Sequence, residues 1–171
     1  MSQIYHKAML QCAQNLEAIE TYLDKAQAFA NAQQIDIAVL LDGRLAPDMK
    51  GLIYQVQSAC DYVKGGAAWL SGQTPPKHED TEKTIDELRE RIHKTVAYAR
   101  SVPEAGYLNA ASQRVAFSWK PGKVIVGDDY LLQMVIPNVY FHIAMVYAIL
   151  RQAGVEVGKM DFLGPLDFVD A

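Results

Sequence analysis

The stretch from Tyr130 to Leu150 constrains the fold of this chain most, because its 21 residues include no formally charged side chain. Asp129 and Arg151 flank it, and it is long enough to form a helix that crosses a bilayer. Its interior nevertheless carries polar residues and a proline that are unfavourable in lipid: Gln133, Pro137, Asn138 and His142. We therefore interpret the stretch as a helix buried on most sides within a soluble bundle, and we expect no membrane partner.

Cysteine usage and the N-terminus indicate a cytoplasmic location. Cys12 and Cys60 are too few for a disulfide framework and lack the spacing of metal ligands. Residues 1–7 contain neither an apolar signal core nor a small-residue cleavage site. A reducing cytoplasm is therefore the expected environment.

Three segments before residue 104 repeat apolar residues every three or four positions, which is typical of helices that pack in a bundle. The first stripe consists of Tyr5, Met9, Cys12, Leu16, Ile19, Leu23, Ala26 and Ala30. The second consists of Leu45, Met49, Leu52, Val56, Ala59, Val63, Ala67 and Leu70. The third consists of Ile85, Leu88, Ile92, Val96 and Ala99. The third helix is expected to begin at Asp80 or Thr81 and to end at Pro103.

The exposed face of the third helix is expected to carry acid–base pairs four residues apart, which stabilise a helix slightly. These pairs are Glu79/Lys83, Glu87/Arg91 and Glu90/Lys94.

The period changes between Arg114 and Val126, where apolar and other residues alternate. Val115, Phe117 and Trp119 share one face, and Pro121-Gly122 has the signature of a type II turn. These features predict a β-hairpin between the third helix and the fourth, which runs to about Gln152. The sequence thus predicts an all-α four-helix bundle with a small hairpin, in one domain that spans residues 1–171 and whose tail from Val155 folds back on it.

The overall charge disfavours a partner made of nucleic acid. The chain has 16 basic and 20 acidic residues, a net charge of −4 and no cluster of Lys and Arg. Phosphate-binding loops, zinc-binding helical motifs and C-x-x-C motifs are absent from the sequence. Composition therefore does not identify a reaction.

Polar residues that interrupt the apolar stripes indicate where a site would lie. Asn138 and His142 are four residues apart and share one face of the fourth helix, as half of a metal site would. The spacing alone favours the other interpretation, in which His142 is a neutral, hydrogen-bonded core histidine and Asn138 satisfies a backbone group freed by Pro137. Asp48 and Gln55 border the second stripe, where they either reach an interhelical cavity or form bundle-edge hydrogen bonds.

A separate line on the second helix, formed by Gln57, Asp61 and Lys64, is expected nearer the outer face. His78, Glu79 and Asp80 adjoin one another in a loop, where solvation is the simpler interpretation than a metal site. Serine and cysteine residues lack a suitably spaced histidine, so nucleophilic catalysis has no support from the sequence. Cys12 lies on the first stripe and is interpreted as a small core residue.

Several runs resemble a bacterial family of unknown function within the DinB/YfiT-like superfamily of four-helix bundles. The runs that carry this resemblance are residues 44–49, 55–61, 79–84, 137–142 and 148–164. They span nearly the whole chain, and they imply the DinB/YfiT-like bundle with its pocket between the second and fourth helices.

The superfamily also implies a divalent metal, often nickel or zinc, held by one histidine on the second helix and an H-x-x-x-H pair on the fourth. Some members transfer a low-molecular-weight thiol onto an electrophile. In this chain the pair falls on Asn138 and His142, and Gln55 or Gln57 stands where the second-helix histidine is expected. The resemblance thus implies at most a weakly held nickel or zinc ion at His142, with water in the open positions.

Three functions are consistent with these residues. The first is a pocket formed by His142, Asn138, Gln55 and Asp48 that binds a small molecule without turnover. The second is a metal- or thiol-dependent transferase that uses the same pocket. The third is a non-catalytic dimeric scaffold in which buried polar residues fix the helix register. We expect a homodimer in solution, and we expect His142 to be neutral at pH 7 because burial disfavours its charged form.

Overall fold

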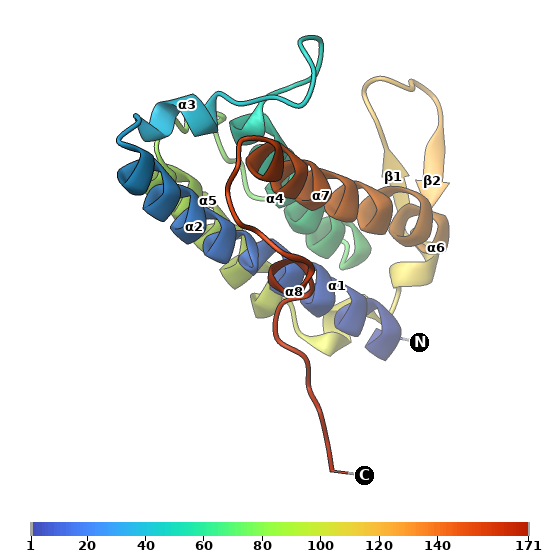
Figure 1. Ribbon diagram of the computed structural model, residues 1–171. Coiled ribbons are helices and arrows are strands. Elements are labelled where there is room, and N and C mark those ends of the chain that lie inside the picture. The colour runs from blue at the N-terminus through green and yellow to red at the C-terminus, as the bar shows by residue number, and fades with distance from the viewer. Residues whose placement is uncertain (1, 171) are drawn as a thin grey trace.

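In the computed structural model, α4 (Leu52–Leu70) is the central helix and packs against α7 (Ile136–Gln152), α5 (Ile85–Ser101) and α1 (Ser2–Glu17) (Figure 1). The structure describes residues 2–170. The apolar stripes of these helices form one core around α4, and α2 (Ile19–Gln33) adds to it by packing on α7. The predicted four-helix bundle with a hairpin before the last long helix is therefore confirmed.

The first predicted helix is divided at Ala18 into α1 and α2 (Ile19–Gln33). The interruption is slight, because Ala18 keeps helical dihedral angles and its N–H still donates to the carbonyl of Gln14 at 3.1 Å. A short helix, α3 (Ile37–Leu41), follows and begins at Asp36, whose side chain accepts from the N–H of Ala38. The apolar stripe therefore continues across the interruption and the core face is unchanged.

The second long helix begins at Leu52 rather than at Leu45, so the predicted start is wrong by about two turns. Residues 42–51 form turns instead, in which the N–H of Leu52 donates to the carbonyl of Gly43. Leu45 and Met49 are half-buried in these turns. Their apolar spacing reflects packing against the core and not a helix.

The third long helix begins at Ile85 and not at Asp80 or Thr81, because Thr84 forms the stronger cap. Its hydroxyl accepts from the N–H of Glu87 while the Glu87 carboxylate accepts from the N–H of Thr84, which is a complete capping box. The residues three positions after Asp80 and Thr81 are Lys83 and Thr84, which cannot form such a box. Residues 71–84 consequently form a long connection.

The predicted hairpin is present as β1 (Arg114–Ala116) and β2 (Val124–Val126), which pair antiparallel with Val115 opposite Ile125. Its turn has the expected geometry: Gly122 has a φ of 74°, and the N–H of Lys123 donates to the carbonyl of Lys120. The hairpin stands beside the beginning of the fourth helix (Figure 1), and its Phe117 ring lies 6.1 Å from that of Tyr130.

The fourth helix is continuous from Gly127 to Gln152, but a segment near its beginning is π-helical. It consists of α6 (Gly127–Asp129), the π-helical segment η3 (Tyr130–Val135) and α7. Pro137 explains the irregularity, because it removes one N–H and its ring displaces the preceding carbonyl groups. Although the helix is long and apolar enough to cross a membrane, its inner face belongs to the core and packs on α4 and α1. This arrangement is that of a core helix in a soluble bundle.

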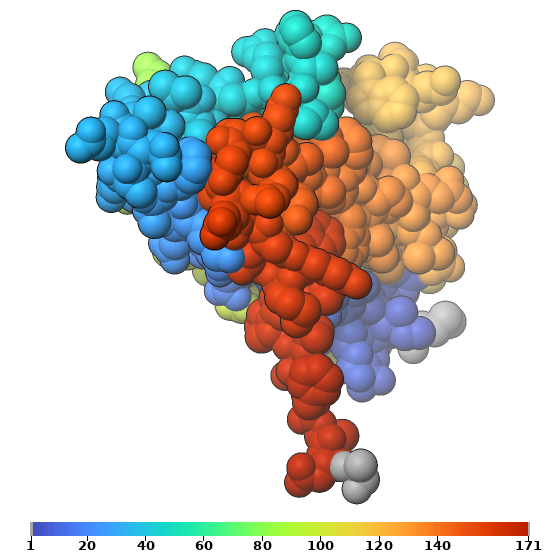
Figure 2. Space-filling model, in the orientation of Figure 1, coloured from blue at the N-terminus to red at the C-terminus, as the bar shows by residue number. Residues whose placement is uncertain are grey.

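The tail folds back on the bundle only in part. α8 (Lys159–Leu163) packs on α2 and α7, where Lys25 and Asp161 form an ion pair of 2.5 Å. Residues 165–170 are exposed and extend away from the bundle (Figure 2), so the expectation is wrong for this last segment.

Candidate functional site

A hydrogen bond between α4 and α7 is at the centre of the candidate site. The His142 Nδ1 and the Gln55 Oε1 lie 2.8 Å apart, and both side chains are buried. The Nε2 of Gln55 donates to the carbonyl of Lys50, so the amide oxygen faces the imidazole. Nδ1 therefore carries the proton, and Nε2 keeps a free lone pair. The second-helix position opposite His142 is thus Gln55, whereas Gln57 bonds to Glu82.

Aromatic rings surround the imidazole of His142. The ring of Tyr62 stacks on it at 5.7 Å, and the rings of Tyr54 and Phe141 meet it edge to face at 6.3 and 5.2 Å. Tyr54 and Phe141 are exposed, whereas Tyr62 is half-buried. Within residues 2–170, Nε2 accepts no hydrogen bond, and it is not sealed from solvent. The site therefore presents one hydrogen-bond acceptor within an aromatic frame.

Burial lowers the pKa of His142 below its ordinary value of 6.5. No charged group contributes to this shift, so the imidazole is neutral at pH 7, as the sequence analysis predicts. Burial also raises the pKa of Tyr62, with smaller contributions from Tyr54 and Asp61. His142 and Tyr62 are therefore uncharged at pH 7, and the ammonium of Lys50 lies 5.4 Å from the centre of the Tyr54 ring.

Asn138 and Asp48 do not contribute side chains to this hydrogen-bonded pair. The Nδ2 of Asn138 donates to the carbonyl of Met134 at 2.6 Å, where the helix is irregular before Pro137. This is the backbone-satisfying role that the sequence allows. Asp48 is exposed in the turn that precedes α4, so its predicted place on the second helix is wrong.

These side chains do not fit the metal that the superfamily implies. Of the three expected ligand positions, only His142 has a free donor, because Asn138 and Gln55 already use their amides in hydrogen bonds. A neutral amide oxygen is also a poor ligand for nickel or zinc. Across residues 2–170, His, Cys, Asp and Glu side chains form no group of three or more that could hold a metal ion.

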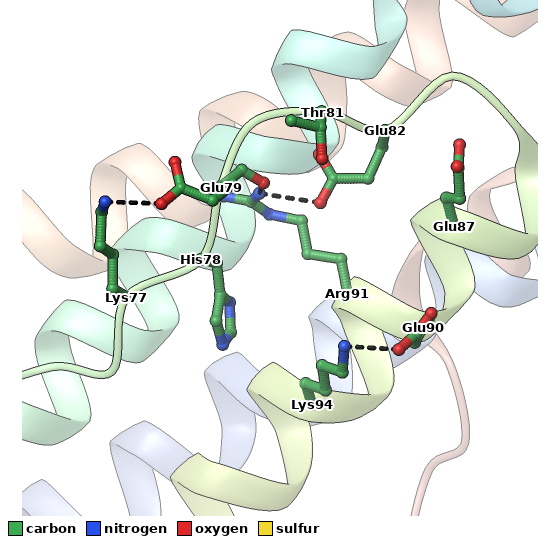
Figure 3. Close-up of a pocket in the computed structure, with 9 residues that line it drawn as sticks. All are labelled: Lys77, His78, Glu79, Thr81, Glu82, Glu87, Glu90, Arg91 and Lys94. Atoms are coloured by element: carbon green, nitrogen blue, oxygen red, sulfur yellow. Dashed lines mark hydrogen bonds and ion pairs between the residues drawn. The ribbon is translucent and has the colours of Figure 1, made fainter.

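A second polar cluster lies between α4, α5 and the connection before α5, and its centre is Arg91 (Figure 3). Arg91 is 3% exposed; its guanidinium donates to Glu82 at 3.0 Å and to Asp61 at 2.9 Å, and it also pairs with Asp80. The sequence pattern does not predict this network, and the predicted pair of Arg91 with Glu87 is wrong because Glu87 caps α5. The sequence does contain one indication of this burial. Arg91 follows Leu88 by three positions, so the two residues lie on the same side of the helix and Arg91 is at the edge of the buried stripe.

The cavity beside Arg91 measures about 350 Å³ and is lined mainly by charged side chains (Figure 3). These charges are mostly compensated: Lys77 pairs with Glu79, Lys94 with Glu90, and Lys64 with Asp61. Because Glu79 is engaged in this way and Asp80 pairs with Arg91, neither carboxylate is free to hold a metal. His78 is half-buried, and its Nδ1 is sealed from solvent without a hydrogen-bond partner within residues 2–170, so the solvated interpretation is wrong for His78. The cluster holds the connection before α5 against the bundle.

Both cysteines are unsuited to nucleophilic catalysis. Cys12 and Cys60 are buried in the core, and burial raises the pKa of each thiol to about 12. The thiolate is the reactive form, so neither side chain is reactive near pH 7. The interpretation of Cys12 as a small core residue is confirmed.

Comparisons with known proteins agree with this fold. Residues 4–163 match the profile of a family described as "Domain of unknown function (DUF1993)". The crystal structure of a DinB family member from Shewanella denitrificans is 42% identical in sequence. The match covers 99% of this chain and 96% of that one, with a TM-score of 0.94. No curated protein matches.

Proposed function

Because the chain belongs to the DUF1993 family and has a DinB-like fold, we propose that it binds a small molecule at the His142 site without a resident metal. The observation that carries this proposal is the hydrogen bond from His142 to Gln55, which fixes a neutral imidazole with Nε2 free. Nε2 is open to solvent and has no protein partner within residues 2–170, so its lone pair is available to a donor on a ligand.

The surroundings of Nε2 define the chemistry of the ligand. A lone-pair acceptor requires a donor, which means a hydroxyl or an N–H group. Tyr54 and Tyr62 supply ring surfaces that favour a flat, apolar body. The ligand class is therefore a planar molecule with one hydrogen-bond donor at its edge, such as a phenol or an indole.

Two other functions compete with this proposal. A metal- or thiol-dependent transferase requires ligands besides His142, and the amides of Gln55 and Asn138 are engaged. A dimeric scaffold requires only that buried polar groups fix the packing of the helices. No contact within residues 2–170 favours either of them over binding.

The test uses side-chain ¹⁵N NMR of the histidines in the full chain. Phenol and indole are titrated, with anisole and N-methylindole as probes of the same shape that lack the donor. We expect a saturable shift of the His142 Nε2 resonance with the donor probes and a much weaker one with the methylated probes. His93→Gln is the matched control, because His93 is exposed on α5.

Two results would contradict the proposal. Equal shifts with the donor and methylated probes, or no saturable shift with any, would exclude a donor-binding site at His142. Stoichiometric nickel or zinc in untagged protein that survives chelation and disappears in His142→Asn would identify the metal-dependent alternative instead.

The proposed location is the cytoplasm. Both cysteines are free thiols in the core, an arrangement that a reducing compartment preserves. Fractionation of the native host with detection of the chain would test this location, and recovery outside the soluble cytoplasmic fraction would contradict it.

A further inference from the structure

A groove of about 260 Å³ lies on α4 beside Tyr62, facing the π-helical segment η3. Its walls are mainly apolar and aromatic: Tyr62, Trp69, Pro75 and Tyr130. Its remaining lining comes from Gly65, Lys64 and Asp61 on α4. None of these residues takes part in the hydrogen bond between His142 and Gln55.

Two hydrogen-bond donors border the same point of this groove. A Cβ placed on Gly65 would lie 3.5 Å from the hydroxyl of Tyr130 and 3.8 Å from the indole nitrogen of Trp69. Because Gly65 has no side chain, that point is left open between them. The Tyr130 residue is 3% exposed, yet its hydroxyl has no hydrogen-bond partner within residues 2–170 and is not sealed from solvent.

The position of Tyr130 is fixed from two sides. It is the first residue of the π-helical segment, and π-helical turns occur often at functional sites. On its other side the ring of Phe117, just after β1, lies 6.1 Å away. Burial raises the pKa of Tyr130, so the hydroxyl keeps its proton and remains a donor.

The charges at the groove compensate each other. Lys64 is 7% exposed, and its ammonium pairs with the carboxylate of Asp61 at 2.9 Å. Asp61 also pairs with Arg91 at 2.9 Å, so the Lys64 and Asp61 charges are already satisfied within the chain and do not call for an ionic ligand. The two donors call for an acceptor oxygen.

We propose that this groove binds a flat, uncharged molecule through a carbonyl oxygen that accepts from Tyr130 and Trp69 above Gly65. Tyr62 and Pro75 contact the apolar body of the molecule. The volume corresponds to one or two fused rings. This groove shares Tyr62 with the aromatic frame of His142. Its proposed donors, Tyr130 and Trp69, take no part in the bond between His142 and Gln55, so different probes and variants test the two proposals.

Trp69 provides the measurement. The chain contains two tryptophans, and Trp119 lies exposed on the hairpin, outside the groove. In a Trp119→Phe background, the fluorescence of Trp69 is followed during titration with 1-indanone, which has the required carbonyl. Indane lacks the oxygen, while benzoate and benzyltrimethylammonium carry opposite charges. We expect a saturable response to indanone and at least tenfold weaker binding of the other three probes.

Two variants test the Tyr130 donor and the open space above Gly65. Tyr130→Phe removes only the hydroxyl, and we expect about a tenfold loss of indanone affinity, as for one hydrogen bond. Gly65→Ala adds a methyl group beside the place where the oxygen sits, at ordinary contact distances that leave the fold intact, and its bulk should abolish saturable binding. Circular dichroism and thermal unfolding confirm that each variant is folded.

Several results would overturn the proposal. No saturable response to indanone would exclude the site. Equal affinity for indane, or no effect of Tyr130→Phe, would show that the donors do not bind the ligand. Preference for benzoate or for benzyltrimethylammonium would show that the ligand is charged. Shifts confined to the His142 resonance would assign the indanone to the other site.

Discussion

The Nδ1 of His142 lies 2.8 Å from the Oε1 of Gln55, in a hydrogen bond that joins α7 to α4 across 87 positions of sequence. A neutral amide opposite an imidazole fixes the ring orientation without stabilising its protonated form. The contact therefore determines which nitrogen is free, while burial keeps the imidazole neutral. Each of these consequences can be measured.

The first prediction concerns pH. Burial lowers the pKa of His142 in the folded chain, so the unfolded chain binds more protons between the folded pKa and 6.5. The stability that this difference confers is fully present above pH 6.5 and is lost as the pH falls through the folded pKa. Urea unfolding at neutral and mildly acidic pH should show a smaller fall for His142→Gln than for the wild type. An equal fall would contradict the shift, and His93→Gln is the control.

The second prediction concerns Gln55→Glu. A carboxylate in place of the amide faces Nδ1–H with a negative charge, which favours the imidazolium form. The pKa of His142 should therefore rise above that of the wild type, as measured by NMR titration of its ring protons. If the pKa stays at the wild-type value, the two side chains are not in contact in solution.

His142 could be singled out from the sequence because it is a polar residue within the uncharged stretch from Tyr130 to Leu150. The resemblance to the superfamily, which matches His142 to a ligand position, implies that it faces the second helix. The sequence leaves both Gln55 and Gln57 as candidates for the second-helix residue opposite His142. A pattern of apolar residues does not determine how α4 is rotated about its axis relative to α7. That rotation depends on close packing between the two helices.

Asp48 shows why the rest could not be predicted. The sequence places Asp48 beside the second stripe because Leu45 and Met49 have helical spacing. In the structure both residues lie in turns. Arg91 shows the opposite error: an i, i+4 pair with Glu87 was the simplest local interpretation, yet Glu87 caps its own helix. The partners of Arg91 lie up to 30 positions away, beyond the reach of a local pattern.

The third prediction concerns Arg91→Met. Removing the guanidinium leaves Glu82, which is largely buried, without its ion pair, and the free energy of unfolding should fall by about 3 kcal/mol. Lys94→Met is the matched control, because its pair with Glu90 is exposed and should change stability by less than about 1 kcal/mol. Urea unfolding of both variants provides the comparison, and equal effects would show that the Arg91 network contributes little.

The fourth prediction is that the chain forms a homodimer, which we propose from the outer surface of the fourth helix. Leu132 and Phe141 are 62% and 51% exposed on a helix that carries no charge between Tyr130 and Leu150. Light scattering at micromolar concentration should give about twice the chain mass of 19.0 kDa, and Phe141→Glu should halve it. A wild-type mass near 19.0 kDa would refute the dimer.

The fifth prediction compares two adjacent glycines of α4. A Cβ on Gly66 would lie 2.8 Å from Cγ1 of Val135 and 2.9 Å from Cε of Met9. Met9 is flexible, but Val135 is β-branched and belongs to the π-helical segment, so it cannot move aside easily. Gly66→Ala should therefore lower the free energy of unfolding by about 1–3 kcal/mol, as overpacking does.

Gly65→Ala is the matched control for this close approach. Its Cβ would lie no closer than 3.5 Å to Tyr130 or Trp69, which is ordinary contact. Replacing glycine by alanine inside a helix then gains up to about 1 kcal/mol from backbone propensity. Thermal or urea unfolding should thus move in opposite directions for the two variants. If both stabilise the chain, α4 and the π-helical segment are not packed as closely in solution as the Gly66–Val135 distance requires.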